Sequence, residues 1–232
     1  MIKYFVRTTL ERRLHDSFSQ VAYSLLIDKE HKVRDIFLKQ LESISDFDVV
    51  LLEDDIILCN NFKERIERII QSHSNEIINF FFGPFDYFES KYKEFAYNQC
   101  TYYPSIILKD IINFFKNNKK PSFVKTPEEH IKYYLHKQKN FKVYTYRPCL
   151  VQHIDNKSIL NKHPVPIPRR CPYFIDYLED LGISYEEAQD PEKTQQLKDY
   201  MDKQFKKNND YIYLLSDELQ QQIANERKQK DE

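Results

Sequence analysis

Three acidic residues follow directly on a short apolar run. Residues 49–52 read Val-Val-Leu-Leu, the acids are Glu53, Asp54 and Asp55, and apolar residues resume at Ile56. A short, continuous apolar run is typical of a strand buried on both faces of a parallel sheet. Carboxylates between two buried runs are costly unless they are paired or bind a ligand. Because hard oxygen ligands favour Mg²⁺ or Mn²⁺, which bind substrate phosphates, the pattern indicates a divalent cation site.

Glu53 and Asp55 are the two acids expected to act together. Side chains alternate along an extended segment, so both should point the same way. Such a pair suits a cation that bridges two phosphate oxygens and stabilises the charge on a leaving nucleoside diphosphate. The alternative is a solvated acidic turn after a strand, with no ligand.

The composition excludes other ways of holding a phosphate. The chain has only 2 glycines, Gly83 and Gly182, so no Walker loop or dinucleotide fingerprint can be written. Lys and Arg number 35 against 36 Asp and Glu, a balance that does not suggest a protein that coats nucleic acid. A phosphate site must therefore use a metal or basic side chains.

The cysteines and the N-terminus predict a soluble intracellular protein, cytoplasmic in its host. The cysteines are widely spaced and form no Cys-x-x-Cys pair, which fits neither a disulfide framework nor a zinc site. The first residues lack an apolar signal region, and no run approaches the ~20 apolar residues of a membrane span. We expect no membrane span and four free thiols, at Cys59, Cys100, Cys149 and Cys171.

Strands and helices are expected to alternate in the first part of the chain, which implies βαβ units and a mostly parallel sheet. The apolar positions from Val33 to Ile44 recur at helical spacing. A final strand pair is expected within residues 142–154. The other expected strands are residues 2–6, 21–27, 49–52 and 76–82, and the other expected helices are residues 61–72, 105–117 and 127–139.

A proline-rich stretch, residues 164–172, marks the end of the compact domain. We expect one domain over residues 1–172 and a charged helical extension over residues 173–232. Apolar residues recur along this extension, so it packs either on the domain or on a second subunit, as in a homo-oligomer. Its exposed, charged helices are expected at residues 173–181 and 192–228.

The acidic motif resembles that of a known family. The buried strand, Glu-Asp-Asp, the apolar run and then Phe62 resemble the metal-binding Asp-x-Asp motif of glycosyltransferases of the GT-A fold. Residues 6–12 and 148–154 are also similar to small glycosyltransferases, phage-encoded ones included. The likeness covers residues 1–177. It implies an α/β, GT-A-like (Rossmann-like) fold, with a mostly parallel central sheet flanked by helices and a C-terminal helical tail.

The resemblance implies a role for each acid and for one histidine. Glu53 and Asp55 would hold the metal and the diphosphate, with Asp54 near the sugar or ribose. His153 matches the position of a third metal ligand. The alternative for His153 is a hydrogen-bonded structural histidine.

The same resemblance implies residues that contact the nucleotide sugar. Arg7, Thr8 and Asp28 would lie near the base and ribose, and Asn98 and Thr101 would line the donor sugar and acceptor. Arg7 has a simpler alternative as the partner of a surface acid, and Asp28 as a helix cap.

The catalytic base and a closing element come from later segments. An inverting transferase needs a carboxylate that takes the acceptor proton, and Glu128 and Glu129 are the candidates. Thr126 and Glu129 also form a capping-box pattern, so we expect one glutamate to cap and leave a base role for the other. Arg169 and Arg170 would close over the diphosphate as a lid, or form an exposed basic linker.

The sequence thus predicts a glycosyltransferase that uses a nucleotide sugar, with UDP-sugar preferred, and Mn²⁺ or Mg²⁺. The acceptor stays open between a glycan, a protein and, for a phage-encoded enzyme, a modified DNA base; basic patches such as Arg12-Arg13 and residues 116–120 keep DNA in view. The competing classes are a metal-dependent nucleotidyl- or phosphotransferase and a non-catalytic carbohydrate- or partner-binding protein of the same fold.

Overall fold

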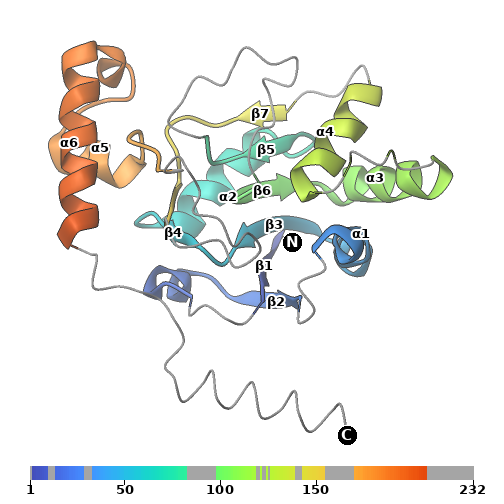
Figure 1. The fold of residues 1–232 in the computed structure, drawn as a ribbon. Coiled ribbons are helices and arrows are strands. Elements are labelled where there is room, and N and C mark those ends of the chain that lie inside the picture. The colour runs from blue at the N-terminus through green and yellow to red at the C-terminus, as the bar shows by residue number, and fades with distance from the viewer. Residues whose placement is uncertain are drawn as a thin grey trace, which may run out of the picture.

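The chain folds as an α/β structure with a central sheet between helices (Figure 1). The computed structural model describes residues 2–9, 14–28, 33–82, 98–118, 121, 124, 126–138, 143–154 and 170–207.

The central sheet has six strands in the order β2-β1-β3-β6-β5-β7. β1 pairs in parallel with β2 and β3, and β5 pairs in parallel with β7. Only β6 runs antiparallel to its neighbours, β3 and β5, so the predicted mostly parallel sheet is confirmed. The strands are β1 (Ile2–Thr8), β2 (Tyr23–Ile27), β3 (Asp48–Glu53), β5 (Ile77–Asn79), β6 (Cys100–Tyr103) and β7 (Val143–Thr145).

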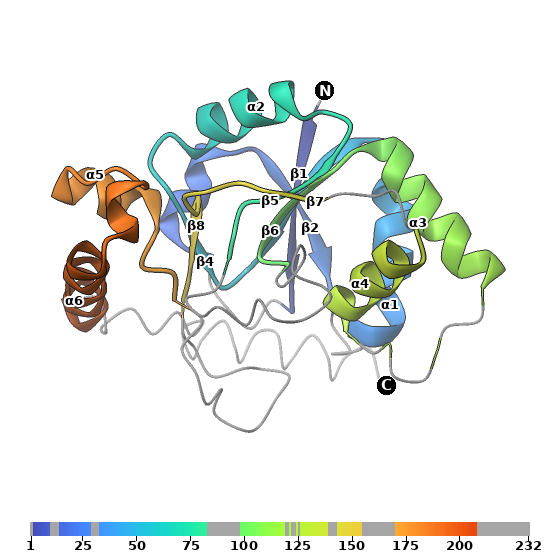
Figure 2. The same ribbon diagram turned by 90° about the horizontal axis from the view of Figure 1, so that it is seen from above.

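Helices cover both faces of this sheet (Figure 2). One face carries α1 (Val33–Ile44), α3 (Ser105–Asn117) and α4 (Pro127–Lys137). The other face carries α2 (Phe62–Ser72), with α5 (Ile175–Leu181) and α6 (Pro191–Lys207) on the same core. Two short 3-10 helices, η1 (Asp16–Gln20) and η2 (Glu187–Gln189), complete the described helical elements.

β3 is buried on both faces, as its apolar run predicted. Val49 and Leu51 pack into the core under α1, α3 and α4, whereas Val50 and Leu52 pack into the core under α2. All four side chains are fully buried. This double burial is the reason why the run shows no alternation of polar and apolar residues.

One strand of the central sheet was not predicted, and one predicted strand pairing was wrong. β6 was not predicted, because its four residues are all buried and show no alternation that marks a strand. The expected final strand pair exists as two strands, but they do not pair with each other. β7 joins β5, whereas β8 (Val151–His153) pairs antiparallel with β4 (Ile56–Leu58) in a second, two-stranded sheet. The prediction assumed that strands adjacent in the sequence pair with each other. Here each of the two strands pairs with a strand that lies far away in the sequence.

The C-terminal helices are attached to the chain's own core. Tyr177 and Leu178 of α5, and Leu197 and Met201 of α6, are buried in the cluster that contains Val50. The expectation of exposed helices was therefore wrong for their apolar sides. The sequence left open whether the extension packs on its own domain or on a second subunit. The described part of it, up to residue 207, packs on its own domain. None of the described helices is both long and apolar enough to cross a membrane.

Candidate functional site

The residues singled out from the sequence gather where β1, β2 and β3 end. Parallel strands bring their carboxyl ends to one edge of the sheet, where open α/β sheets bind ligands. Arg7 of β1 lies directly opposite Glu53, the last residue of β3. Asp28 follows β2, and its backbone N–H donates to the carbonyl of Thr8 at 2.8 Å. Thr8 and Asp28 are both buried.

Arg7 and Glu53 form an ion pair inside this edge. Arg7 Nη1 lies 2.9 Å from Glu53 Oε1, with 8% and 22% of the two side chains exposed. The guanidinium carbon of Arg7 also lies 5.2 Å from the ring centre of Phe37 on α1. Arg7 thus pairs with an acid of the candidate site and not with a surface acid. A buried charge requires such a partner.

The carboxyl group of Glu53 takes up a proton at higher pH than an ordinary glutamate does. Burial, which disfavours the charged form, raises its pKa to about 8, while the Arg7 guanidinium opposes this shift. The neighbouring carboxylates of Asp55, Glu128 and Asp54 raise it further. A pKa near 8 means that Glu53 exchanges its proton within the physiological range, which is common at functional sites.

The acidic motif turns after Glu53. β3 ends there, and Asp54 and Asp55 form a turn that leads into β4. The extended alternation expected for Glu53 and Asp55 therefore stops, and the two side chains meet different partners. Asp54 is buried in the turn, and the carbonyl of Asp55 accepts a hydrogen bond from the backbone of Ile154 at 2.8 Å.

Asp55 faces His153. Asp55 Oδ2 and His153 Nε2 are 3.4 Å apart, and 20% and 7% of the side chains are exposed. The antiparallel pairing of β4 with β8 creates this contact, because it places Ile56 opposite His153. The structure thus brings together the acid and the histidine that the sequence suggested as metal ligands.

The Asp55–His153 spacing fits a shared cation. Two ligand atoms that each lie ~2.0–2.2 Å from one cation are about 2.8–3.1 Å apart at octahedral angles and about 3.3–3.6 Å apart at tetrahedral angles. Over the described ranges, no group of three His, Cys, Asp or Glu side chains converges as a metal site, and Glu53 is engaged by Arg7. A cation held by two protein ligands would complete its shell with phosphate oxygens and waters, as Mg²⁺ commonly does.

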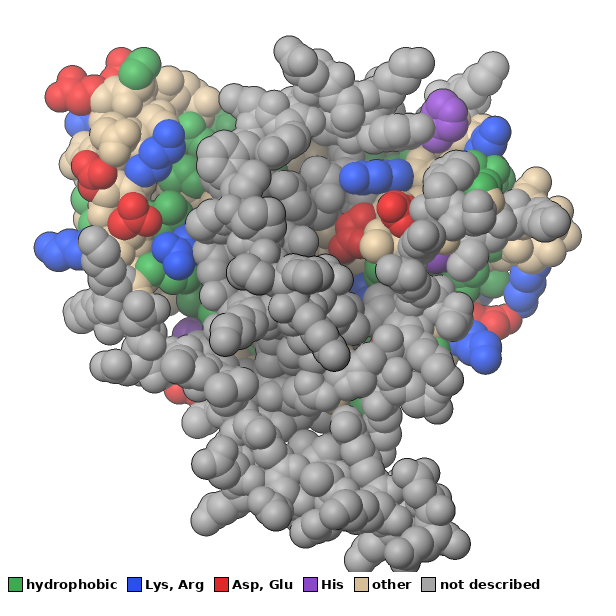
Figure 3. All heavy atoms as spheres, viewed as in Figure 1, with side chains coloured by type: hydrophobic (Ala, Val, Ile, Leu, Met, Phe, Trp, Pro, Cys, Tyr) green, Lys and Arg blue, Asp and Glu red, His purple; other side chains and the backbone are tan. Residues whose placement is uncertain are grey.

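The start of α4 adds a carboxylate to the same region. The capping box is confirmed, because Thr126 N–H donates to Glu129 Oε2 at 2.8 Å and Glu129 N–H donates to Thr126 Oγ1 at 3.3 Å. Glu128, in the same turn, contributes to the raised pKa of Glu53 and, after burial, to that of Tyr103. Figure 3 shows acidic side chains beside a basic one over the end of α4 that adjoins the sheet.

Polar groups before β6 border Glu53. The backbone N–H of Glu53 donates to the carbonyl of Gln99 at 3.0 Å, and Tyr103 Oη donates to Asn98 Oδ1 at 2.9 Å. Asn98 Nδ2, Gln99 Oε1 and Arg7 Nε are buried without a hydrogen-bond partner in the described part of the chain. Buried polar atoms of this kind call for a ligand or water partner. The sequence assigned Asn98 and Thr101 to the donor sugar and acceptor. Thr101 is fully buried on β6, and Gln99 is buried in the same segment.

The arginines expected in a lid are not both placed. Arg169 lies outside the described residues. Arg170 is attached to α6, with its guanidinium carbon 3.9 Å from the ring centre of Phe205 and Nη1 3.7 Å from Asp202. The contacts described for Arg170 are thus with the C-terminal helix.

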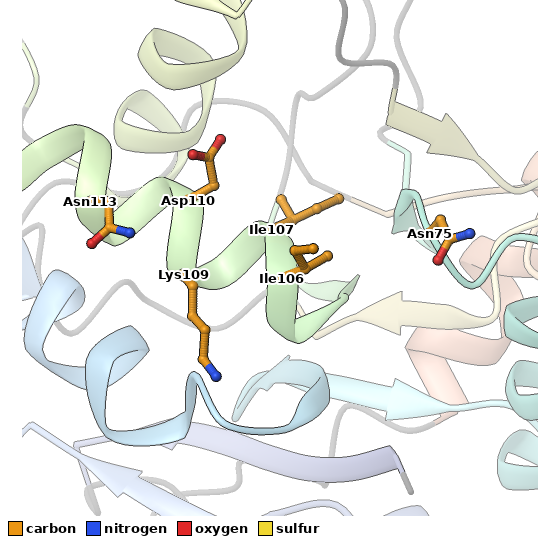
Figure 4. Close-up of a pocket in the computed structure, with 6 residues that line it drawn as sticks. All are labelled: Asn75, Ile106, Ile107, Lys109, Asp110 and Asn113. Atoms are coloured by element: carbon orange, nitrogen blue, oxygen red, sulfur yellow. The ribbon is translucent and has the colours of Figure 1, made fainter.

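A separate groove runs along the outer side of α3 (Figure 4). Lys109 points from it towards the α1 end and pairs with Asp46 at 3.0 Å. None of the candidate catalytic or metal-binding residues lines this groove, whose lining residues are Asn75, Ile106, Ile107, Lys109, Asp110 and Asn113.

Comparison with known proteins adds little to this geometry. No family model matches the sequence, and no curated protein matches it. Among solved structures, the chain is similar to A197 from STIV with a TM-score of 0.39 and 13% sequence identity, over 66% of this chain and 85% of that chain. A likeness of this size supports no inference about chemistry, so function has to be inferred from the site itself.

Proposed function

We propose that this protein is a metal-dependent glycosyltransferase that takes its sugar from a nucleotide-sugar donor, with a UDP-sugar as the first choice. The observation that carries this proposal is the meeting of Asp55 and His153 at 3.4 Å, beside the strand ends that carry Arg7, Thr8 and Glu53. This arrangement supports a Mn²⁺- or Mg²⁺-dependent site for a diphosphate.

Different residues around the strand ends would bind different parts of the nucleotide sugar. Asp55 and His153 would hold the cation, which supplies charge neutralisation for the leaving nucleoside diphosphate. Thr8 and Asp28 would receive the base and ribose at the ends of β1 and β2, and Asp54, in the turn after β3, would lie near the sugar or ribose.

Hydrogen bonds to the sugar have donors and acceptors in place. Asn98 Nδ2 can donate and Gln99 Oε1 can accept, and both are buried without a partner in the described residues. The Arg7 guanidinium opposes the burial that raises the pKa of Glu53, and so favours the carboxylate form.

Of the two glutamates at the start of α4, we assign Glu128 as the base that deprotonates the acceptor. Glu129 is occupied by the capping box, whereas Glu128 lies in the first turn of α4, where its charge acts on Glu53. In an inverting reaction, Glu128 would take the proton of the acceptor hydroxyl as that oxygen attacks the sugar. A retaining reaction would not need this base.

The acceptor class stays open among a glycan, a protein and a modified DNA base. The described residues do not support the idea that the basic patches named from the sequence bind DNA. Lys116 pairs with Glu42 at the surface, and Arg12 and Arg13 lie outside the described residues.

Ligand-dependent stabilisation and product analysis test the proposal. UDP with Mn²⁺ at about 100 times its Kd should raise the Tm by roughly 5–10 °C, and neither component alone should match this rise. A panel of nucleotide sugars should yield one donor that releases its nucleoside diphosphate in the presence of Mn²⁺.

Other products would identify the competing classes. Release of pyrophosphate from a nucleoside triphosphate would identify a nucleotidyltransferase. Stabilisation by free sugars, without cleavage of any donor, would identify a binding protein. No response to any nucleoside diphosphate with either metal would rule out the proposed function.

A further inference from the structure

Two cysteines outside the candidate site meet sulfur to sulfur. The thiol of Cys149 lies 2.9 Å from the sulfur of Cys171, and the two residues are 22 positions apart in the chain. Both side chains are fully buried, and both cysteines are free. A disulfide bond of about 2.05 Å would bring the sulfurs only ~0.9 Å closer.

The backbone on each side of this contact is fixed by hydrogen bonds. Cys149 N–H donates to the carbonyl of Tyr173 at 3.0 Å, and its own carbonyl accepts from Ile175 at 3.0 Å. The side chain of Gln152 accepts from the N–H of Cys171 and donates to its carbonyl, both at 2.8 Å. These bonds hold the two chain segments side by side and keep the two sulfurs in contact.

We propose that Cys149 and Cys171 form an oxidation site, at which a two-electron oxidant such as hydrogen peroxide produces an intramolecular disulfide. One thiolate attacks a peroxide oxygen, which breaks the O–O bond, gives a sulfenic acid and releases the other oxygen as water after it takes up a proton. The second thiol attacks the sulfenic sulfur and expels another water. The two thiols lose two electrons in total, and these reduce the peroxide.

Burial sets the speed of this reaction. Burial raises the pKa of the Cys149 thiol well above its usual value, and the contact with Cys171 adds to this shift. The thiolate is the reactive form, so oxidation is slow at neutral pH and becomes faster as the pH rises.

The disulfide would close a segment that bears on the candidate site. Residues 149–171 include β8, with His153, and Arg170 next to Cys171. Closing a loop of this size should raise the Tm of the chain by roughly 5–10 °C. The disulfide would thus tie Cys149, two residues before the strand that carries His153, to Cys171, four residues before α5.

Thiol counting on the full-length protein tests this proposal without any substitution. Reduced protein is exposed to hydrogen peroxide at about pH 7 and about pH 8.5, then denatured, labelled with N-ethylmaleimide and weighed by mass spectrometry. We expect two labels per chain in place of four, with faster loss at the higher pH, and a linked peptide pair that contains Cys149 and Cys171. Dithiothreitol should restore four labels and remove the rise in Tm.

Single variants locate the bond. Cys149→Ser and Cys171→Ser should each abolish the linked peptide pair, whereas Cys59→Ser, another buried free cysteine, should keep it. Four labels after peroxide treatment of the wild-type chain would overturn the proposal. So would a disulfide that joins other cysteines or two chains, or oxidation that stops at a sulfinic acid.

Discussion

Asp55 Oδ2 and His153 Nε2 lie 3.4 Å apart, joined by the pairing of β4 with β8. Neither strand belongs to the six-stranded sheet. The short two-stranded sheet therefore serves to bring a histidine from late in the chain to the acidic turn after β3. This contact leads to the first prediction.

Removing either member of this pair should abolish metal-dependent turnover. Asp55→Asn and His153→Ala should each lower turnover by about 100-fold or more, because a cation with two protein ligands loses half of them. Turnover measured against Mn²⁺ concentration checks this. Asp46→Asn is the matched control, since Asp46 is a surface acid, 82% exposed, that pairs with Lys109. Equal turnover in Asp55→Asn and the control would remove the metal assignment.

The ionisation of Glu53 should make the folded chain less stable as the pH rises. Its pKa is about 8 in the folded chain against an ordinary value of 4.5, so the folded state binds more protons than the unfolded state between these values. Stability contributed by the neutral carboxyl is complete below about pH 4.5 and is lost as the pH rises to about 8. Relative to Glu53→Gln, the wild-type chain should lose on the order of 1–3 kcal/mol across this window.

Urea unfolding at several pH values measures this loss. The free energies of unfolding of the wild-type chain and of Glu53→Gln should diverge between pH 5 and pH 8 and run parallel above it. Parallel curves throughout would show that Glu53 titrates at its ordinary pKa in the folded chain.

The two glutamates at the start of α4 should separate catalysis from stability. Glu129→Ala removes the side-chain half of the capping box and should cost about 0.5–1 kcal/mol of stability while turnover is kept. Glu128→Gln should lower the turnover of an inverting enzyme on the order of 100-fold or more, with little change in Tm. Parallel measurements of turnover and thermal unfolding distinguish the two effects. A retaining stereochemistry of the product, with full turnover in Glu128→Gln, would remove the base role.

The packing of α6 on the core should be visible in the stability of the whole chain. Leu197→Ala removes a fully buried side chain of this helix and should lower the free energy of unfolding by about 2–4 kcal/mol. Ile106→Ala, at a side chain that is 73% exposed, should change it by less than about 0.5 kcal/mol. A single unfolding transition, shifted in Leu197→Ala, is the expected result in urea. Two transitions would indicate that α6 unfolds apart from the core.

The local features of this protein were determined by the sequence alone. The apolar run before Glu53 predicted a strand buried on both faces, and Val49 and Val50 indeed enter opposite cores. The pattern of Thr126 and Glu129 predicted the capping box that begins α4. Both features depend on residues within a few positions of one another, so the chain's own periodicity and hydrogen-bonding groups decide them.

Contacts between distant segments were decided by the tertiary structure. The sequence did not indicate that β6 lies between β3 and β5. It also did not indicate that β8 pairs with β4 and not with β7. It placed Glu53 and Asp55 on one side, whereas the turn after β3 sends Glu53 to Arg7 and Asp55 to His153. The sequence therefore supplied the chemical groups of the site. Their partners depend on strand pairings between residues far apart in the chain, which no local pattern encodes.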